Sequence, residues 1–244
     1  MIRVLWLSAL ALLAICATFA QLDRAARRTP ALAALVPPPF RSFAQEKLVI
    51  AEVRTAPPAQ ALAMARTLVQ RRPMPSEHLS LLAMAEQRMG HTRNSGVLIQ
   101  QAARRGWRDV LAQQAMFDIA LNAGAPDEAA RRFGAVWALQ ASDVPIEEMT
   151  RRILATPQGR KAVAQALVAE SRWRGQFLGA AGAFAPVEVA QVVSDAAHQD
   201  ADFECPALAR TADLIAKAQK AQEAAQVRAL PCKAPAKRNQ GMFR

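Results

Sequence analysis

Apolar positions along most of the chain recur at the three- and four-residue spacing of an amphipathic helix. In one such stretch, Leu62, Ala65 and Leu68 share a face. Prolines and glycines separate the stretches, and we expect helices at about 42–54, 59–72, 76–89, 92–105 and 108–123, then one beginning at Pro126. β-branched residues never form the alternating runs that strands need. The pattern therefore predicts an all-α protein.

The first segment has a different pattern, because an uncharged run from Val4 to Ala20 follows the basic start of the chain. This pattern is typical of a secretory signal, and residues 18–20 fit a cleavage site. The run also reaches the length of a membrane-spanning helix, about 17–25 residues. Basic residues follow at once and hinder export. We therefore favour a retained single-pass anchor over residues 1–22 with a periplasmic body. Cleavage and release into the periplasm is the alternative.

Prolines and changes in composition divide the rest of the chain into segments. Residues 23–41 hold Pro30 and three consecutive prolines, which predicts an extended polyproline linker. A helical domain is expected over residues 42–200. Pro206 then opens a stretch that predicts one long helix, so that residues 201–232 form a capping element or, alternatively, a partner-binding helix. Residues 233–244 are expected to be a basic, disordered tail.

Cys205 and Cys232 lie at the two ends of this predicted long helix. An unbroken helix would hold its ends roughly 35 Å apart, whereas a disulfide requires Cα atoms within about 7 Å. The two cysteines are therefore expected to be free or paired between chains, unless the helix is a hairpin.

Two glycines mark a repeat, since Gly90 and Gly124 are 34 residues apart and each stands between two predicted helices. A helix–turn–helix unit of this length is typical of tetratricopeptide repeats. Residues 42–139 resemble that family at its packing positions: Leu79, Leu82, Ala83, Gly90, Ser95, Ile99 and Ala102 in one unit, and Met116, Phe117, Ala120, Gly124, Ala129 and Phe133 in the next. The chain departs from the family in having no tyrosine and in placing Gln113 where an aromatic residue is usual.

The resemblance implies a tetratricopeptide-like (TPR-like) α-α superhelix, a solenoid of helical hairpins whose first helices line a groove. The groove-facing positions would be Ser80, Met84, Gln87, Gln114, Asp118 and Asn122. Such side chains suit a protein partner, bound as an extended peptide or a helix. Similar anchored repeat proteins of bacteria serve envelope assembly, including polysaccharide biosynthesis or export. The resemblance thus implies a non-catalytic protein-interaction scaffold at the bacterial inner membrane.

Charge and chemistry change this picture little. The net charge is +11, but the basic residues are scattered, apart from the tail cluster Lys233, Lys237, Arg238 and Arg244. This distribution favours attraction to anionic lipid over nucleic acid. His78, His91 and His198 are far apart and are expected at surface or boundary positions.

No metal site, cofactor site or phosphate loop is predicted, and we expect no enzyme. Two alternatives stay open. An envelope glycan-processing enzyme with a helical superstructure would require paired carboxylates in a cleft. A basic nucleic-acid-binding helical protein would require a continuous basic stripe.

Overall fold

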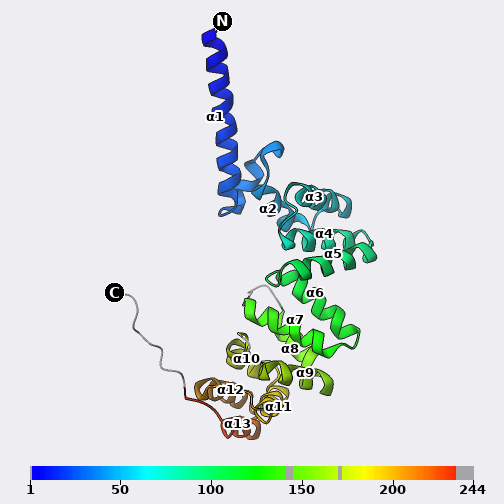
Figure 1. The fold of residues 1–244 in the computed structure, drawn as a ribbon, viewed down its shortest axis with the longest axis vertical. Helices are drawn as coiled ribbons and strands as arrows, with labels where there is room; N and C mark the ends of the chain where they lie inside the picture. The colour runs from blue at the N-terminus through cyan, green and yellow to red at the C-terminus, as the bar shows by residue number, and fades with distance from the viewer. Residues whose placement is uncertain (1, 141–144, 170–171, 235–244) are drawn as a thin grey trace, which may run out of the picture. The chain divides into compact units, whose positions relative to one another are not determined.

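The structure is a computed structural model that describes residues 2–140, 145–169 and 172–234. Within these ranges every regular element is a helix, which confirms the all-α prediction (Figure 1). The chain forms two compact units, an N-terminal unit reaching Ala112 and a C-terminal unit starting at Gln113.

The elements follow one another in a simple order. Those before the unit boundary are α1 (Ile2–Ala26), the 3-10 turns η1 (Pro30–Leu35) and η2 (Pro38–Phe40), α2 (Phe43–Glu52), α3 (Pro58–Arg71), α4 (Ser76–Arg88) and α5 (Thr92–Arg105). Helix α6 (Val110–Asn122) contains the boundary. After it come α7 (Pro126–Leu139), α8 (Ile146–Leu154), α9 (Pro157–Val168), α10 (Arg174–Ala180), η3 (Ala181–Ala183), α11 (Pro186–Ala197), α12 (Cys205–Lys217) and α13 (Ala221–Arg228).

Helix boundaries recur at the predicted period. Helices α4 and α6 begin and end 34 residues apart, and so do α5 and α7. Helix α3 stands 34 residues before α5 at both of its ends. Beyond α7 the period is lost, since α9 begins only 31 residues after α7. The repeat in helix boundaries therefore extends from α3 to α7.

The two predicted closing glycines end their helices in the same way. Gly90 has φ +81° and Gly124 has φ +68°, the left-handed region that glycine adopts without strain. The amide of His91 donates to the Glu86 carbonyl at 2.9 Å, and that of Ala125 donates to the Ala120 carbonyl at 2.9 Å. These are the hydrogen bonds of the Schellman motif. The prediction that these two glycines end their helices is confirmed, and so is the left-handed conformation expected at Gly90.

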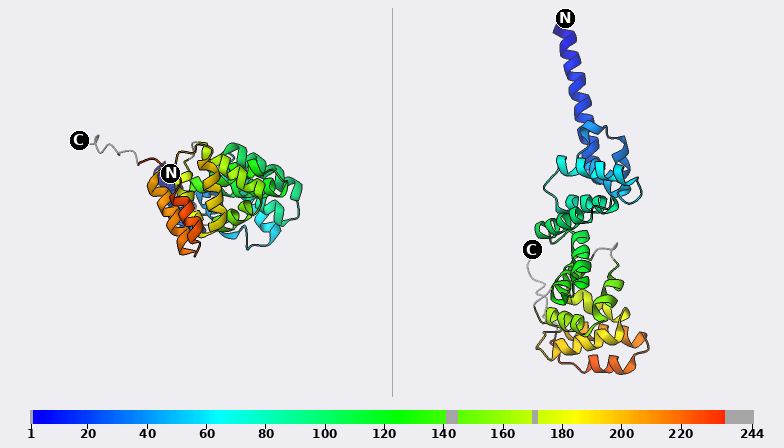
Figure 2. Two further views of the ribbon diagram at one scale, coloured as in Figure 1. Left: turned by 90° about the horizontal axis from the view of Figure 1, so that it is seen from below. Right: turned by 90° about the vertical axis from the view of Figure 1, so that its right-hand side faces the viewer.

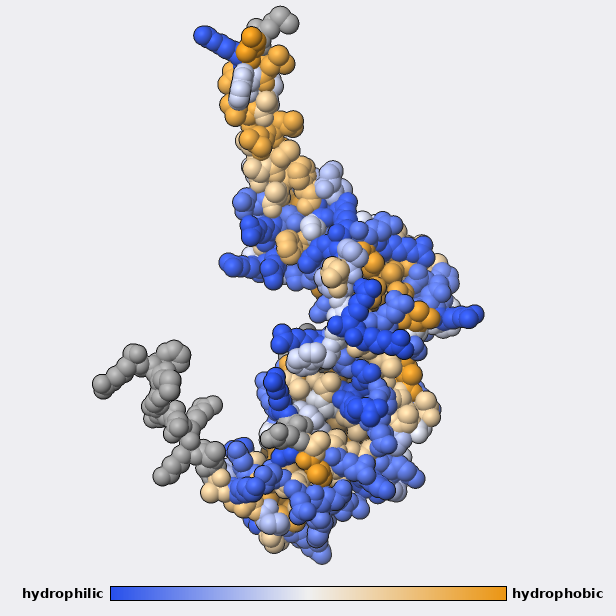
Figure 3. Space-filling model, viewed as in Figure 1, coloured by the Kyte–Doolittle hydropathy of each residue, from blue (hydrophilic) through white to orange (hydrophobic). Residues whose placement is uncertain are grey.

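Helix α1 has a long exposed apolar surface and a short packed end. It is long and apolar enough to cross a membrane, and Figure 3 shows its outer surface as largely hydrophobic. At the other end, the buried carboxylate of Asp23 accepts hydrogen bonds from the amides of Ser42, Phe43 and Ala44 at 2.8–3.1 Å. These amides open α2, where a negative charge is favoured. Asp23 thus joins the end of α1 to the body of the N-terminal unit.

The proline-rich segment is not an extended linker, which corrects the expectation for residues 23–41. Helix α1 continues to Ala26, and the chain then folds into η1 and η2. Ala33 and Val36 are buried in a small cluster with Ala26 and Ala44. Burial of these apolar side chains outweighs the polyproline preference of the consecutive prolines.

The C-terminal unit is built around one continuous apolar core. Phe133 lies at its centre, with ring centroids of Phe117, Trp137, Trp173 and Phe177 within 6.2 Å of its own. Aliphatic side chains from helices α8 to α13 complete the same cluster. Large aromatic side chains contribute most of the area buried in such a core.

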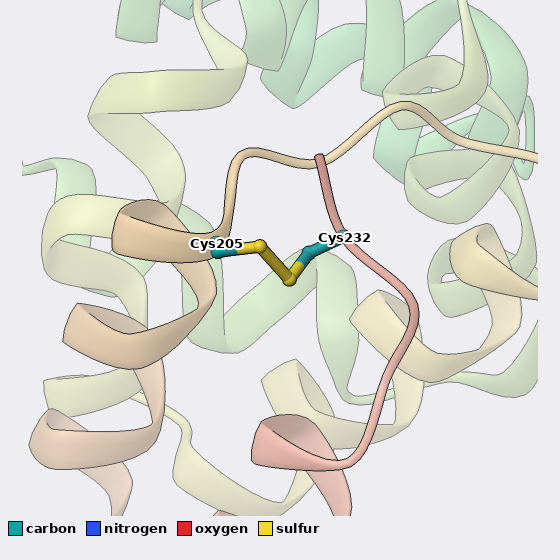
Figure 4. Close-up of a disulfide and its surroundings, with 2 residues drawn as sticks. All are labelled: Cys205 and Cys232. Atoms are coloured by element: carbon teal, nitrogen blue, oxygen red, sulfur yellow. A yellow bond between two sulfur atoms is a disulfide. The ribbon is translucent and has the colours of Figure 1, made fainter. Parts of the chain in front are cut away.

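The predicted long C-terminal helix is a hairpin, which was the stated alternative, and the expectation that Cys205 and Cys232 are free or paired between chains was wrong. Gln219 adopts a left-handed conformation (φ 62°), and the Lys220 amide donates to the Ile215 carbonyl at 3.3 Å, which closes α12. Helix α13 then returns along α12 and buries Ala224 and Val227 in the core. Cys205 and Cys232 form a disulfide with Cα atoms 4.9 Å apart (Figure 4).

The chain after the disulfide is tied back to the unit. The Cys205 amide donates to the Lys233 carbonyl at 3.0 Å, and the Lys233 amide donates to the Phe203 carbonyl at 2.8 Å. The Lys233 Nζ atom lies 2.6 Å from the Asp202 carboxylate. Lys233 is therefore structured, whereas the other members of the predicted basic cluster, Lys237, Arg238 and Arg244, lie outside the described residues.

Candidate functional site

The three predicted groove residues of α4 have different environments. Ser80 is buried, and its hydroxyl donates to the Asp109 carboxylate at 2.6 Å. Met84 is half-buried against the apolar cluster around Leu68. Gln87 is exposed. Only Gln87 of this group offers an open polar side chain, because the turn between α5 and α6 covers Ser80.

The three predicted groove residues of α6 also differ from one another. Gln114 is half-buried, and Asn122 is exposed at the last residue of the helix. The Asp118 carboxylate lies 2.7 Å from a guanidinium nitrogen of Arg152 on α8. Asp118 therefore serves an ion pair within the C-terminal unit, and Asn122 is the most accessible of the three.

Asp109 is a buried polar residue that was not among the residues predicted from the sequence. Its carboxylate accepts the Ser80 hydroxyl and the amide of Ala112 at 3.1 Å, so it caps the start of α6. Burial raises the pKa of Asp109 above its ordinary value, against the opposing effect of these hydrogen bonds. The pair links α4 to the turn before α6 and has a structural role.

A buried histidine of the N-terminal unit contacts α2 and the end of α3 from its place on α4. His78 is fully buried, which corrects its expected surface or boundary position. Its Nδ1 atom lies 2.7 Å from the Arg72 carbonyl oxygen, and its Nε2 atom lies 3.2 Å from Glu46 Oε2. Each ring nitrogen therefore faces an oxygen atom, and these two contacts hold the ring between α2 and the end of α3.

Glu46 is the centre of this cluster. An Arg72 guanidinium nitrogen donates to its carboxylate at 2.8 Å, and the same guanidinium stacks over the ring of Phe43 at 4.5 Å. The hydrogen bond from His78, aided by the nearby positive charges, lowers the pKa of Glu46 from 4.5 to about 2 despite partial burial. Glu46 is thus ionised at neutral pH, and its carboxylate contacts both Arg72 and His78.

A pocket of about 380 Å³ opens beside this cluster. Its lining is mainly charged: Arg27, Phe43, Glu46, Lys47, Arg72, Pro75, Glu77 and His78. No sequence pattern indicates this pocket, because its lining residues are spread over more than fifty positions and no regular spacing connects them.

Another buried carboxylate, that of Glu86, stabilises the end of α4. Glu86 lies 3.0 Å from a guanidinium nitrogen of Arg66 and 2.6 Å from His91 Nδ1. Burial alone would raise the pKa of Glu86, but the hydrogen bonds from His91 and Arg66 outweigh it and hold the pKa below its ordinary value. His91, at the surface as expected, thereby fixes the turn that follows Gly90.

The C-terminal unit has a cleft of about 490 Å³ next to its disulfide. Asp200 and Asp202 line it, and Asp202 is paired with Lys233 at the rim. His198 is exposed on the preceding turn and bonds the Ser194 carbonyl at 2.7 Å. Within the described ranges, no group of three or more histidine, cysteine or acidic residues is arranged to hold a metal ion.

These observations leave Gln87 and Asn122 as the exposed members of the predicted groove set, each within its own unit. No protein-family model matches the sequence, and neither a curated protein nor a solved structure is similar to it.

Proposed function

We propose that this protein is a membrane-anchored, TPR-like scaffold that binds another protein and has no catalytic activity of its own. The observation that carries the proposal is the direct continuity of an exposed apolar helix with helices whose boundaries repeat every 34 residues. The helix supplies a membrane attachment, and stacked helical pairs supply a surface for an extended peptide or a helix.

The disulfide supports a body outside the cytoplasm. Disulfides persist in oxidising compartments such as the bacterial periplasm and are rare in the cytosol. Cys205 and Cys232 are bonded, so the proposal assigns the protein to the bacterial inner membrane with a periplasmic body. Envelope assembly, including polysaccharide biosynthesis or export, is the process that the repeat resemblance favours.

Membrane attachment and orientation can be tested in cells producing the full chain. After extraction of the membranes with alkaline carbonate, the protein is expected to stay in the pellet. Added protease is expected to degrade the body in spheroplasts, whose outer membrane has been opened, and not in intact cells. A protein recovered in the carbonate supernatant, or a body protected in intact spheroplasts, would contradict the proposed attachment or orientation.

Partner binding can be tested with a photo-crosslinking residue placed at Gln87. Gln101 is a matched control, because it is also an exposed glutamine but lies on the second helix of the same pair. Specific protein adducts are expected from position 87 and not from position 101. Equal labelling from both positions would remove the support for a groove lined by the first helices.

A further inference from the structure

An uncharged segment lies between α1 and α2. From Thr29 to Phe40 the chain has no charged residue, although Arg28 precedes it and Arg41 follows it. Several of its apolar residues are exposed, and the exposed fraction of Leu35 is 64%. Contiguous exposed apolar surface marks candidate sites of contact with a partner or a membrane, and this segment is such a candidate.

The body of the N-terminal unit holds this segment in place. Arg71 of α3 donates from Nη1 to the carbonyl oxygens of Pro38 at 2.8 Å and Arg41 at 2.6 Å. Arg41 Nε donates to the Val36 carbonyl at 2.7 Å. These bonds anchor the backbone after Leu35, and the buried Ala33 anchors it before Leu35, so that Leu35 is presented to solvent from a fixed backbone.

The segment also lies beside the exposed apolar helix α1. The ring centroids of Phe40 and Phe19 are 5.3 Å apart, and Phe19 lies seven residues, or about 10 Å, before the end of α1. Figure 1 and the right-hand view of Figure 2 both show the segment alongside the lower turns of α1.

Helix α1 as a whole is long enough to cross a bilayer, but the part that projects beyond its contact with Phe40 is at the lower limit of that length. From Ile2 to Thr18 the helix extends about 25 Å at 1.5 Å per residue, whereas a hydrocarbon core is about 30 Å thick. A segment kept wholly in water would leave the bilayer several ångströms too thick for the helix. The difference between the helix length and the thickness of the hydrocarbon core disappears when the turn of α1 at Phe19 and the segment beside it enter the headgroup region.

We propose that residues 29–40 form a membrane-contact segment, with Leu35 inserted at the boundary between lipid headgroups and acyl chains. The exposed Arg24 and Arg28, just beyond the apolar part of α1, lie where headgroup phosphates would meet them. This inference rests on the proposed membrane attachment and adds a second point of contact, which fixes the orientation of the N-terminal unit on the bilayer.

The test uses the full chain with Cys16→Ala and Leu35→Cys, reconstituted into phosphatidylcholine vesicles with a minor share of phosphatidylglycerol. A polarity-sensitive fluorophore on position 35 is expected to show a blue-shifted emission that is quenched by spin-labelled lipid. Val97→Cys in the same background is the control, because Val97 is 50% exposed on α5, a helix that packs on α4. The fluorophore at position 97 is expected to behave as in water.

A second variant tests the length argument directly. Insertion of four leucines after Leu12 lengthens the freely projecting helix to about 31 Å. Quenching at position 35 is then expected to decrease, because the lengthened helix spans the core without the segment. A decrease supports the inference, and unchanged quenching contradicts it.

The outcomes separate the inference from the proposed function. Aqueous emission at position 35 in a protein that resists carbonate extraction overturns the membrane-contact segment and leaves the anchor intact. A blue shift without quenching by lipid overturns it too, since another protein surface would then cover Leu35. Release of the protein by carbonate overturns the anchor and the segment together.

Discussion

The two compact units bury different kinds of side chain between their helices. Among the described residues, the buried ionisable side chains Asp23, His78, Glu86 and Asp109 all belong to the N-terminal unit. In the C-terminal unit, the core is a continuous set of aromatic and aliphatic side chains around Phe133. The first unit therefore depends on charge and protonation, and the second on packing and on its disulfide.

This contrast follows from how the two cores are filled. Alanine, valine and leucine side chains form only small apolar clusters in the N-terminal unit, and polar groups with several hydrogen bonds join the helices beside them. Buried polar groups that are fully paired specify one arrangement of helices, but removal of one partner is costly. Aromatic cores tolerate changes in pH and respond instead to lost volume.

The largest expected effect is on the aromatic core. Phe133→Ala should lower the free energy of unfolding of the C-terminal unit by about 3–5 kcal/mol, because it leaves a cavity among four aromatic rings. Hydrogen exchange read by mass spectrometry should show faster exchange in α7, α9 and α10. The exchange of α3 and α4 should stay unchanged, and a parallel increase there would contradict separate cores.

The disulfide is expected to matter nearly as much. Replacing Cys205 and Cys232 together with serine should cost the C-terminal unit about 2–4 kcal/mol, since the bond restricts the unfolded chain. Urea unfolding of this variant should match that of the wild type under reducing conditions. Cys16→Ser, which removes a free cysteine, serves as the control and should unfold like the wild type.

The N-terminal unit should instead show a specific acid response. The pKa of Glu46 is depressed from 4.5 to about 2 in the folded chain, so its contribution is complete above pH 4.5 and is lost as the pH falls toward 2. Glu46→Gln should lower stability at neutral pH by about 1–3 kcal/mol. It should also flatten the loss of stability between pH 4.5 and 2.

The control for this prediction is Glu147→Gln, which removes an exposed ion pair with Arg151 in the C-terminal unit. Such pairs contribute little, about 0–1 kcal/mol. Thermal unfolding followed across the acid range should therefore distinguish the two variants. Equal slopes for Glu46→Gln and the wild type below pH 4.5 would show that the cluster around His78 does not depend on a charged carboxylate.

The smallest expected effects come from two glycines inside helices. A Cβ atom at Gly134 would lie 2.5 Å from the Trp173 ring nitrogen, whereas a Cβ at Gly96 meets no atom within 4 Å. Gly96→Ala should therefore stabilise the protein by about 0.5–1 kcal/mol through helix propensity. Gly134→Ala should destabilise it by about 1–3 kcal/mol through overpacking. Calorimetry should show shifts of opposite sign, and a shared direction would contradict the close packing at Trp173.

Local patterns in the sequence determined the helices of this protein. The apolar period, the prolines at helix starts and the glycines at 90 and 124 predict the all-α class and the boundaries of α3 to α7, because each depends on residues within one or two turns. The same patterns identified the apolar N-terminal helix. The groove positions Gln87 and Asn122 were expected from the family resemblance, and both are exposed in the structure.

Only the tertiary structure decided the features that join distant residues. No local signal ends α12 at Gln219, and the reversal there is stabilised by burial of α13 and by a disulfide that local helix geometry had argued against. The anchoring of the proline segment by Arg71 and the burial of His78 and Ser80 likewise depend on partners twenty or more residues away. Helix propensity is a sum of small local terms, and long-range burial and pairing outweigh it wherever the two disagree.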